Sequence, residues 1–200
     1  MTTAIERIDS IRETRLAAVV AEDRAKPDGQ EGVFEPTAGE WRHMTFAGRE
    51  STVIEQAAAP DVEAIKAMVV AAYTKYIERI GKRPAPMNAD YEALVKSGDL
   101  YVLRVDGATV GAIHVARADD SLSIGNLVVA PEWQGHGLGR MLIGFAEDMA
   151  RSLTSPALTL YTNEMMYENI ALYTKMGFVE TARRTVDGYN RVYFRKQLQE

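Results

Sequence analysis

The amino-acid sequence predicts an α+β fold, a mixed and mostly antiparallel sheet with helices on both faces. Short apolar runs of strand length and longer amphipathic segments follow one another in the order β-α-α-β-β-β-α-β-α-β-β. Two consecutive strand junctions consist of the tight turns Asp106-Gly107 and Asp119-Asp120, and such turns join antiparallel neighbours. Hydrophobic residues make up 46% and charged residues 26% of the 200-residue chain, which suits a globular domain with a buried core.

Residues 1–48 are expected to form an arm that precedes one domain over residues 49–200. Residues 4–25 favour a helix with an incomplete apolar stripe, and residues 26–40 are rich in glycine and proline, which is typical of a linker. The stripe could pack on the chain's own domain or on a second copy. We therefore expect a possible homodimer.

The elements of the domain follow in order along the chain. A first strand is expected near residues 51–55, and Asn88 is expected to cap a short helix that runs to Lys96. The remaining predicted elements are a helix over 61–80, strands over 100–105, 108–116 and 121–130, a helix from the glycine-rich turn to about 153, a strand over 157–161, a helix over 165–176, and strands near 178–183 and 191–196.

Residues 134–139 read Gln-Gly-His-Gly-Leu-Gly and follow the apolar run 126–130. A glycine-rich turn between a strand and an amphipathic helix presents unpaired N–H groups, which bind anionic oxygen. Gly135, Gly137 and Gly139 have no Cβ, so a phosphate can approach the backbone closely. The Walker pattern is excluded because it needs a lysine here, and the dinucleotide pattern has a different spacing. The alternative is that this glycine-rich loop only connects the two elements and binds no ligand.

Two motifs carry a resemblance to a known family over roughly residues 50–198. Gln134, Gly137 and Gly139 fit the pattern Q/R-x-x-G-x-G/A, and Tyr173 and Gly177-Phe178 fit a second motif at the end of a later helix. The chain resembles the GNAT (GCN5-related) N-acetyltransferase superfamily. Residues 76–87 also look like one subgroup of small, mostly uncharacterised bacterial members.

This resemblance implies the family fold (acyl-CoA N-acyltransferase-like), with acetyl-CoA as cosubstrate and no metal. The strands at 123–130 and 157–161 would splay apart, and the pantetheine arm would lie between them. Tyr173 is the implied catalytic residue, which would give a proton to the leaving thiolate. The implied cofactor-binding residues are Leu127, Val129, Gln134, Gly135, His136, Gly137, Leu138, Gly139, Arg140 and Asn169, with Asn163 as an alternative source of the amide. His136 is expected to be exposed on the loop rather than to act as a base.

The general base stays open. Many family members have an acidic residue on the strand before the loop, but this chain has Ile124-Gly125-Asn126 there. The candidates are Glu55, Asp90, His114 and Glu168.

A pocket for the acceptor is expected between the first helices and the late strands. Its candidate lining residues are Tyr73, Tyr76, Arg79, Arg83, Tyr189 and Arg191. The break after the first helix is locally basic, and this indicates an acceptor with a carboxylate or phosphate, unless the charges are merely solvated.

Composition limits the partners and the location. A net charge of −5 argues against general affinity for nucleic acid or acidic membranes, so neither is expected as a partner. The absence of cysteine excludes disulfides and a cysteine acyl-enzyme. With no predicted signal or membrane-spanning run, a cytoplasmic location is expected.

Three functions compete on this sequence. The favoured one is an N-acetyltransferase in which a small-molecule amine acceptor attacks acetyl-CoA directly in a ternary complex. The second is a protein or peptide acetyltransferase, and the third is a non-catalytic acyl-CoA sensor.

Overall fold

The computed structural model describes residues 44–46 and 49–198, so the helix and linker expected over residues 4–40 lie outside the described residues. The described residues form one 8-stranded sheet of order β1-β2-β3-β4-β5-β6-β8-β7. Its strands are β1 (Met44–Phe46), β2 (Arg49–Gln56), β3 (Leu100–Val105), β4 (Ala108–Ala118), β5 (Ser121–Val129), β6 (Ala157–Asn163), β7 (Val179–Val186) and β8 (Tyr189–Gln197).

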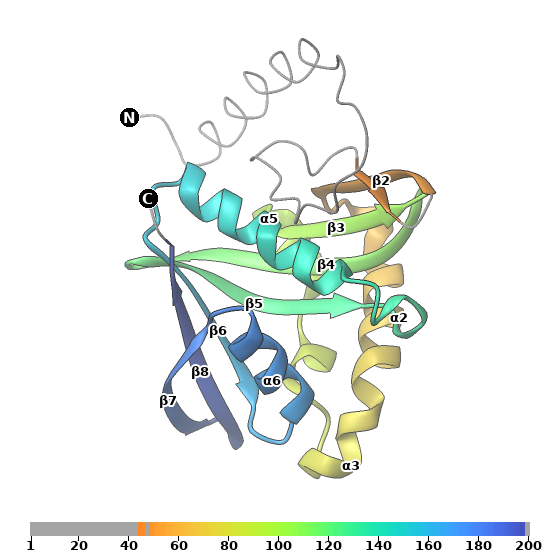
Figure 1. The fold of residues 1–200 in the computed structure, drawn as a ribbon. Coiled ribbons are helices and arrows are strands. Elements are labelled where there is room, and N and C mark those ends of the chain that lie inside the picture. The colour runs from red at the N-terminus through yellow and green to blue at the C-terminus, as the bar shows by residue number, and fades with distance from the viewer. Residues whose placement is uncertain (1–43, 47–48, 199–200) are drawn as a thin grey trace.

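Helices cover both faces of this sheet, as the sequence predicts (Figure 1). On one face, α5 (Leu138–Ser152) and α6 (Tyr167–Lys175) pack over a core that includes Leu103. On the other face, α2 (Val62–Tyr73) and α4 (Tyr91–Ser97) pack over a core that includes Val102. Successive β3 side chains thus point to opposite cores, which is the alternation that a strand imposes.

The expected long helix over residues 61–80 is interrupted. It consists of α2, a 3₁₀ turn over residues 74–76 and α3 (Ile77–Ile80), which ends at Gly81 in the left-handed conformation (φ 78°). The next helix corrects one prediction, because Asn88 does not cap it. Asn88 ends a short 3₁₀ turn, and the side chain of Asp90 accepts the Ala93 N–H at 2.9 Å to cap α4.

The β3–β4 turn has the conformation that its sequence demands. Asp106 (φ 50°) and Gly107 (φ 80°) both have positive φ, as a two-residue turn of the I′ type requires. Because β3, β4 and β5 follow one another through such short turns, they form an antiparallel meander. The prediction of a mostly antiparallel sheet is confirmed.

The exception is the pair β5–β6, which is parallel and short. The two strands pair only at Leu122↔Leu158, Ser123↔Thr159 and Ile124↔Leu160. Beyond that point β5 continues along β4, while β6 continues along β8 to Asn163. The strands therefore part after three paired residues, and the sheet is open between them at this end.

Candidate functional site

A cavity of about 280 Å³ lies where β5 and β6 part. Side chains from both helical layers and from the late hairpin line it. The lining residues are Tyr73, Ile80, Pro84, Ala85, Pro86, Ala89, Tyr91, Leu94, His114, Ile124, Gly125, Asn126, Leu127, Leu160, Tyr161, Thr162, Asn163, Met166, Asn169, Tyr173, Tyr189 and Arg191. Its walls are thus largely apolar and aromatic, with a few polar groups, which is typical of a ligand site.

The backbone of β5 presents polar groups to the gap. The Ala130 N–H donates to Val110 O of the β4 segment at 2.9 Å. Because inward and outward groups alternate along an antiparallel strand, the N–H and C=O groups of Leu127 and Val129 point away from β4. Side chains already hold both carbonyls: the Tyr73 hydroxyl lies 3.2 Å from Leu127 O, and Gln134 Nε2 donates to Val129 O at 3.0 Å. The N–H groups of these two residues face the open gap.

The glycine-rich loop follows directly and has the geometry of an anion site. Gly135 (φ 82°) and Gly137 (φ 85°) are both left-handed, and Gly137 is the N-cap of α5. The first bond of the helix runs from Met141 N–H to Gly137 O at 3.0 Å. Within the described chain, the N–H groups of Leu138, Gly139 and Arg140 donate to no acceptor, and no side chain caps the helix.

Space beside the loop is open. A Cβ built on Gly135 or Gly137 would meet no atom within 4 Å, so these glycines are required by backbone conformation rather than by packing. Gln134 is exposed, but it is held in place because its N–H donates to Pro131 O and its side chain to Val129 O. His136 and Arg140 are exposed, and His136 Nδ1 lies 3.0 Å from Gln134 O, as expected of a loop residue.

Tyr173 reaches the cavity from α6 and is buried, with 8% of its surface exposed. Its ring packs against Phe178 and Phe194, with centroids 5.9 and 6.0 Å away. Burial, with a smaller contribution from Tyr76, raises the pKa of Tyr173 to about 12, so the phenol keeps its proton. Among the described residues its hydroxyl has no hydrogen-bond partner, so the hydroxyl is available to a ligand.

Two residues that the sequence did not single out fix the opposite wall. Asn126 Oδ1 accepts the Tyr73 hydroxyl at 2.8 Å, and Asn126 Nδ2 donates to the Tyr91 hydroxyl at 3.1 Å. Tyr91 in turn donates to Pro86 O at 2.8 Å. These hydrogen bonds link α2, β5 and α4. Tyr91 lies a long way along the chain from Asn126, and no local pattern links them.

His114 also lines the cavity, and Gly125 makes room for it. The β4–β5 register shifts at His114, where Asn126 pairs with His114 and Ile124 with Val115, so Gly125 is an extra residue in β5. A Cβ on Gly125 would overlap the imidazole of His114. Burial lowers the pKa of His114, against a smaller opposing effect of the Asp99 carboxylate, so the imidazole is neutral near pH 7.

The other candidate bases do not line the cavity. Glu55 accepts a bond from Arg104 at 2.6 Å, and Asp90 caps α4. Glu168 is half-exposed and accepts two bonds from Arg79 Nη1, at 2.9 and 3.1 Å. This hydrogen bond holds the pKa of Glu168 below its usual value, which keeps the carboxylate ionised and paired.

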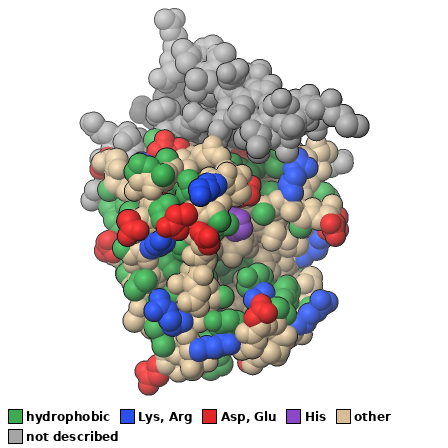
Figure 2. All heavy atoms as spheres, turned by 180° about the vertical axis from the view of Figure 1, so that it is seen from behind, with side chains coloured by type: hydrophobic (Ala, Val, Ile, Leu, Met, Phe, Trp, Pro, Cys, Tyr) green, Lys and Arg blue, Asp and Glu red, His purple; other side chains and the backbone are tan. Residues whose placement is uncertain are grey.

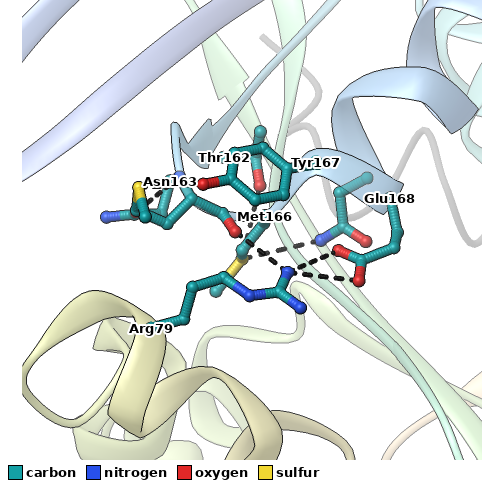
Figure 3. A network of polar contacts seen from close by, with 8 residues as sticks. Arg79, Thr162, Asn163, Met166, Tyr167 and Glu168 are labelled. Carbon is teal, nitrogen blue, oxygen red and sulfur yellow. Dashed lines mark hydrogen bonds and ion pairs between the residues drawn. The ribbon is translucent and has the colours of Figure 1, made fainter.

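Arg79 was expected to line the pocket, but it instead links α3 to the start of α6 (Figure 3). It reaches from α3 to the β6–α6 connection, where it also donates to Met165 O at 3.1 Å, and it lies over the rings of Tyr76 and Tyr167. Arg79, Tyr76 and Arg83 therefore do not line the cavity, whereas Tyr73, Tyr189 and Arg191 do.

Both amides left open by the sequence lie in the cavity wall. Asn163 Oδ1 accepts the Met165 N–H at 2.9 Å, and Asn169 Nδ2 lies 3.6 Å from the sulfur of Met166. Figure 3 shows Asn163 and Met166 near the start of α6. In the described part of the chain, no group of three or more His, Asp or Glu side chains could hold a metal ion. None of the described helices is long and apolar enough to cross a membrane.

A family model described as acetyltransferase (GNAT) domain matches residues 96–180, a range that includes His114, the 134–140 loop and Tyr173. Peptidyl-lysine N-acetyltransferase YjaB of Salmonella typhimurium is 36% identical over 67 residues, which are 34% of this chain and 43% of that protein. The chain thus aligns with less than half of this curated relative.

Solved structures of similar fold cover the described domain. A GNAT-family acetyltransferase from Listeria monocytogenes gives a TM-score of 0.60 at 16% identity over 78% of this chain and 99% of that chain. PaiA N-acetyltransferase from Thermoplasma acidophilum, solved in complex with coenzyme A, gives 0.62 at 16% identity over 74% and 99%. Residues 96–180 therefore match the GNAT acetyltransferase domain, and the described domain shares the fold of solved GNAT acetyltransferases.

Proposed function

We propose that this protein is an N-acetyltransferase that moves an acetyl group from acetyl-CoA to a primary amine of a small acceptor. The observation that carries the proposal is the parting of β5 and β6 after three paired residues. Tyr173 lines the cavity in that gap, and the glycine-rich loop lies at the end of β5. Direct attack in a ternary complex fits a chain without cysteine.

The residues present suit coenzyme A as the bound cosubstrate. The N–H groups of Leu138, Gly139 and Arg140 would hold the pyrophosphate, with the open space at Gly135 and Gly137 leaving it room. The gap-facing N–H groups of Leu127 and Val129 would hold the amides of the pantetheine arm, as in the addition of a strand. Asn163 and Asn169 are the nearby side-chain amides in the wall.

Acetyl-CoA supplies the acetyl group as a thioester. The amine forms the new C–N bond with the acetyl carbon, and the C–S bond breaks to release a thiolate. Tyr173 donates its phenolic proton to that thiolate. With a pKa of about 12, the buried phenol is protonated at physiological pH and therefore has a proton to donate.

His114 is the proposed proton acceptor. An alkylammonium has a pKa of about 10.4, so the acceptor must lose a proton to attack. Of the four candidate bases, His114 is the one that lines the cavity, and its lowered pKa keeps it neutral and able to accept. The nitrogen loses its second proton to solvent as the C–S bond breaks. The proton on His114 then also passes to solvent, and Tyr173 regains one from solvent, before the next turnover.

A small acceptor fits the volume of the cavity, about 280 Å³, which is at the lower end of ligand sites. A peptidyl-lysine acceptor is the second candidate, because the YjaB relative carries that activity in its name. Its side chain would enter the cavity while the peptide stays outside.

Release of free thiol from acetyl-CoA is the experiment that tests the proposal. The panel contains small amines, amino acids, polyamines, aminoglycosides and lysine peptides, and Tyr173→Phe serves as the matched variant. We expect turnover with at least one small amine and loss of it in the variant. Turnover with lysine peptides alone would favour the second candidate. Tight binding of acetyl-CoA without turnover on the whole panel would contradict the enzyme and favour a sensor.

A further inference from the structure

Arg191 is a largely buried cation in the wall of the cavity. It lies on β8 opposite Asn163 of β6, and only 15% of its side chain is exposed. Its guanidinium lies over the ring of Tyr161, with 4.4 Å between the Cζ atom and the ring centroid. Among the residues that line the cavity, Arg191 carries the full positive charge, and no Asp or Glu lines it.

The guanidinium is poorly paired for a buried charge. Nε is buried without an acceptor, and Nη1 donates to no described residue. Nη2 has one partner, Asp187, at a long 3.4 Å, and the Asp187 carboxylate is 79% exposed. Arg184 stands opposite Arg191 on β7, so a second cation faces it across the hairpin. A buried charge is costly unless it is paired, and this one has donors to spare.

The surroundings of Arg191 add to the positive potential. Lys82 Nζ donates to Gly188 O at 2.7 Å and lies over the Tyr189 ring, so it is fixed beside the β7–β8 turn. The Tyr189 hydroxyl donates to Arg83 O at 2.7 Å, which ties the same hairpin to the segment after α3. Lysine and arginine side chains are frequent on the lower part of the face in Figure 2, the end where Figure 1 shows α3.

This arrangement is unfavourable for an acceptor that is only a cation. The cavity wall offers no carboxylate to an ammonium group, and Arg191 repels it. An acceptor that carries its own carboxylate removes both problems, because the carboxylate pairs with Arg191 and cancels the charge of the amine. A planar guanidinium matches a carboxylate through two parallel hydrogen bonds.

We propose that Arg191 binds the carboxylate of the acceptor, so that the preferred substrates are amino acids with an apolar or aromatic body. This inference rests on the proposed function and names its acceptor class. The body of the acceptor would lie against Tyr161 and Tyr189, and the amine would point to the side where His114 and Tyr173 line the cavity. Polyamines and aminoglycosides, which carry several positive charges, are disfavoured.

Matched acceptor pairs test the inference. Each pair shares one apolar body and differs in the carboxylate: leucine and isopentylamine, phenylalanine and phenethylamine, 6-aminohexanoate and pentylamine. We expect the wild type to prefer the acid of at least one pair by about 10-fold or more in kcat/KM. Arg191→Met should lower kcat/KM for that acid by about 10- to 100-fold, chiefly through KM, and leave its neutral partner nearly unchanged.

Two further variants separate charge from geometry and from general damage. Arg191→Lys keeps the positive charge but lacks the planar guanidinium. Its kcat/KM for the acid should lie between those of the wild type and Arg191→Met. Arg183→Met removes an exposed arginine on β7 that is paired with Glu180 outside the cavity, so it should behave as the wild type. Thermal melting shows that each variant is folded, and the wild-type preference within pairs needs no variant at all.

A binding measurement keeps this proposal separate from the proposed function. Calorimetry on the coenzyme A-loaded wild type and Arg191→Met gives the affinity for each acid without any transfer. An acid that binds the wild type at least about 10-fold more tightly than it binds Arg191→Met supports the carboxylate site. If no amine is acetylated, that result contradicts the proposed function alone. Equal affinity in the two proteins, or a wild type that prefers the neutral amine in every pair, would overturn the proposal for Arg191.

Discussion

The imidazole of His114 occupies the space that a side chain on Gly125 would fill. Gly125 is the extra residue of the β4–β5 register shift, so it lies beside the strand position from which His114 reaches the cavity. Where many relatives are expected to carry an acid on this strand, the chain has a glycine and, on the neighbouring strand, a histidine. The absence of a side chain at Gly125 is therefore what allows His114 to take its position in the cavity wall.

Gly125→Ala should therefore act through His114. The new Cβ would lie 2.9 Å from Cε1 of the imidazole, and the ring must rotate away to make room. We expect kcat to fall by about 10²-fold, as for His114→Asn, with thermal stability nearly kept. The double variant should be no slower than His114→Asn alone, because the two changes remove the same group. Additive losses in this cycle would separate Gly125 from His114.

The pH dependence of turnover should carry the signature of His114. Burial lowers the pKa of His114 below its usual 6.5, while Asp99 opposes this shift and the positive Arg191 stands in the same cavity wall. The neutral base exists above that pKa, so kcat at saturating acceptor should fall as pH drops through it, below about 6.5. A kcat profile of His114→Asn that keeps the same acid limb would assign the limb to another group.

Glu168→Gln should leave catalysis in place. The carboxylate pairs with Arg79 rather than lining the cavity, and both side chains are partly exposed (53% and 32%). A solvent-exposed pair of this kind contributes little to stability, so we expect a melting temperature close to that of the wild type. We expect kcat within about threefold of the wild type. A 100-fold loss of kcat in a folded protein would restore Glu168 as a candidate base.

The sequence allowed prediction of the parts that depend on local chemistry. Gly135 and Gly137 are left-handed at the helix start, and the Asp106-Gly107 turn forms where its residues require positive φ. The prediction that Asn88 caps α4 was wrong because Asp90 lies two residues closer to the helix and both side chains are good caps.

Which residues line the pocket could not be predicted from the sequence, because it depends on contacts between residues that are far apart along the chain. The 3₁₀ turn over residues 74–76 changes the phase of the helix, and Arg79 turns to Glu168 instead of the cavity. His114 could not be ranked above the other bases, because the register shift that brings Gly125 beside it has no sequence signature. The wall formed by Tyr91 and Asn126 likewise joins residues that are distant along the chain.

Tyr173→Phe tests the proposed acid. Its hydroxyl has no partner in the described chain, so its removal leaves no buried group unpaired, and stability should hardly change. We expect kcat to fall by about 10²-fold with little change in acetyl-CoA affinity, because the proton is needed in the transition state. Slow hydrolysis of acetyl-CoA can serve as the readout before an acceptor is known. A variant as active as the wild type would remove Tyr173 from the mechanism.

Binding of acetyl-CoA at the 134–140 loop is the central claim, and calorimetry with two matched variants tests it most directly. Gly137 is left-handed and borders open space, and asparagine and aspartate tolerate this conformation better than other side chains, so Gly137→Asn and Gly137→Asp should both fold. The two variants differ chiefly in charge. We predict that Gly137→Asp binds acetyl-CoA at least about 10-fold more weakly than Gly137→Asn, because its carboxylate repels the pyrophosphate. Equal affinity in the two folded variants would contradict the assignment of this loop to the cosubstrate.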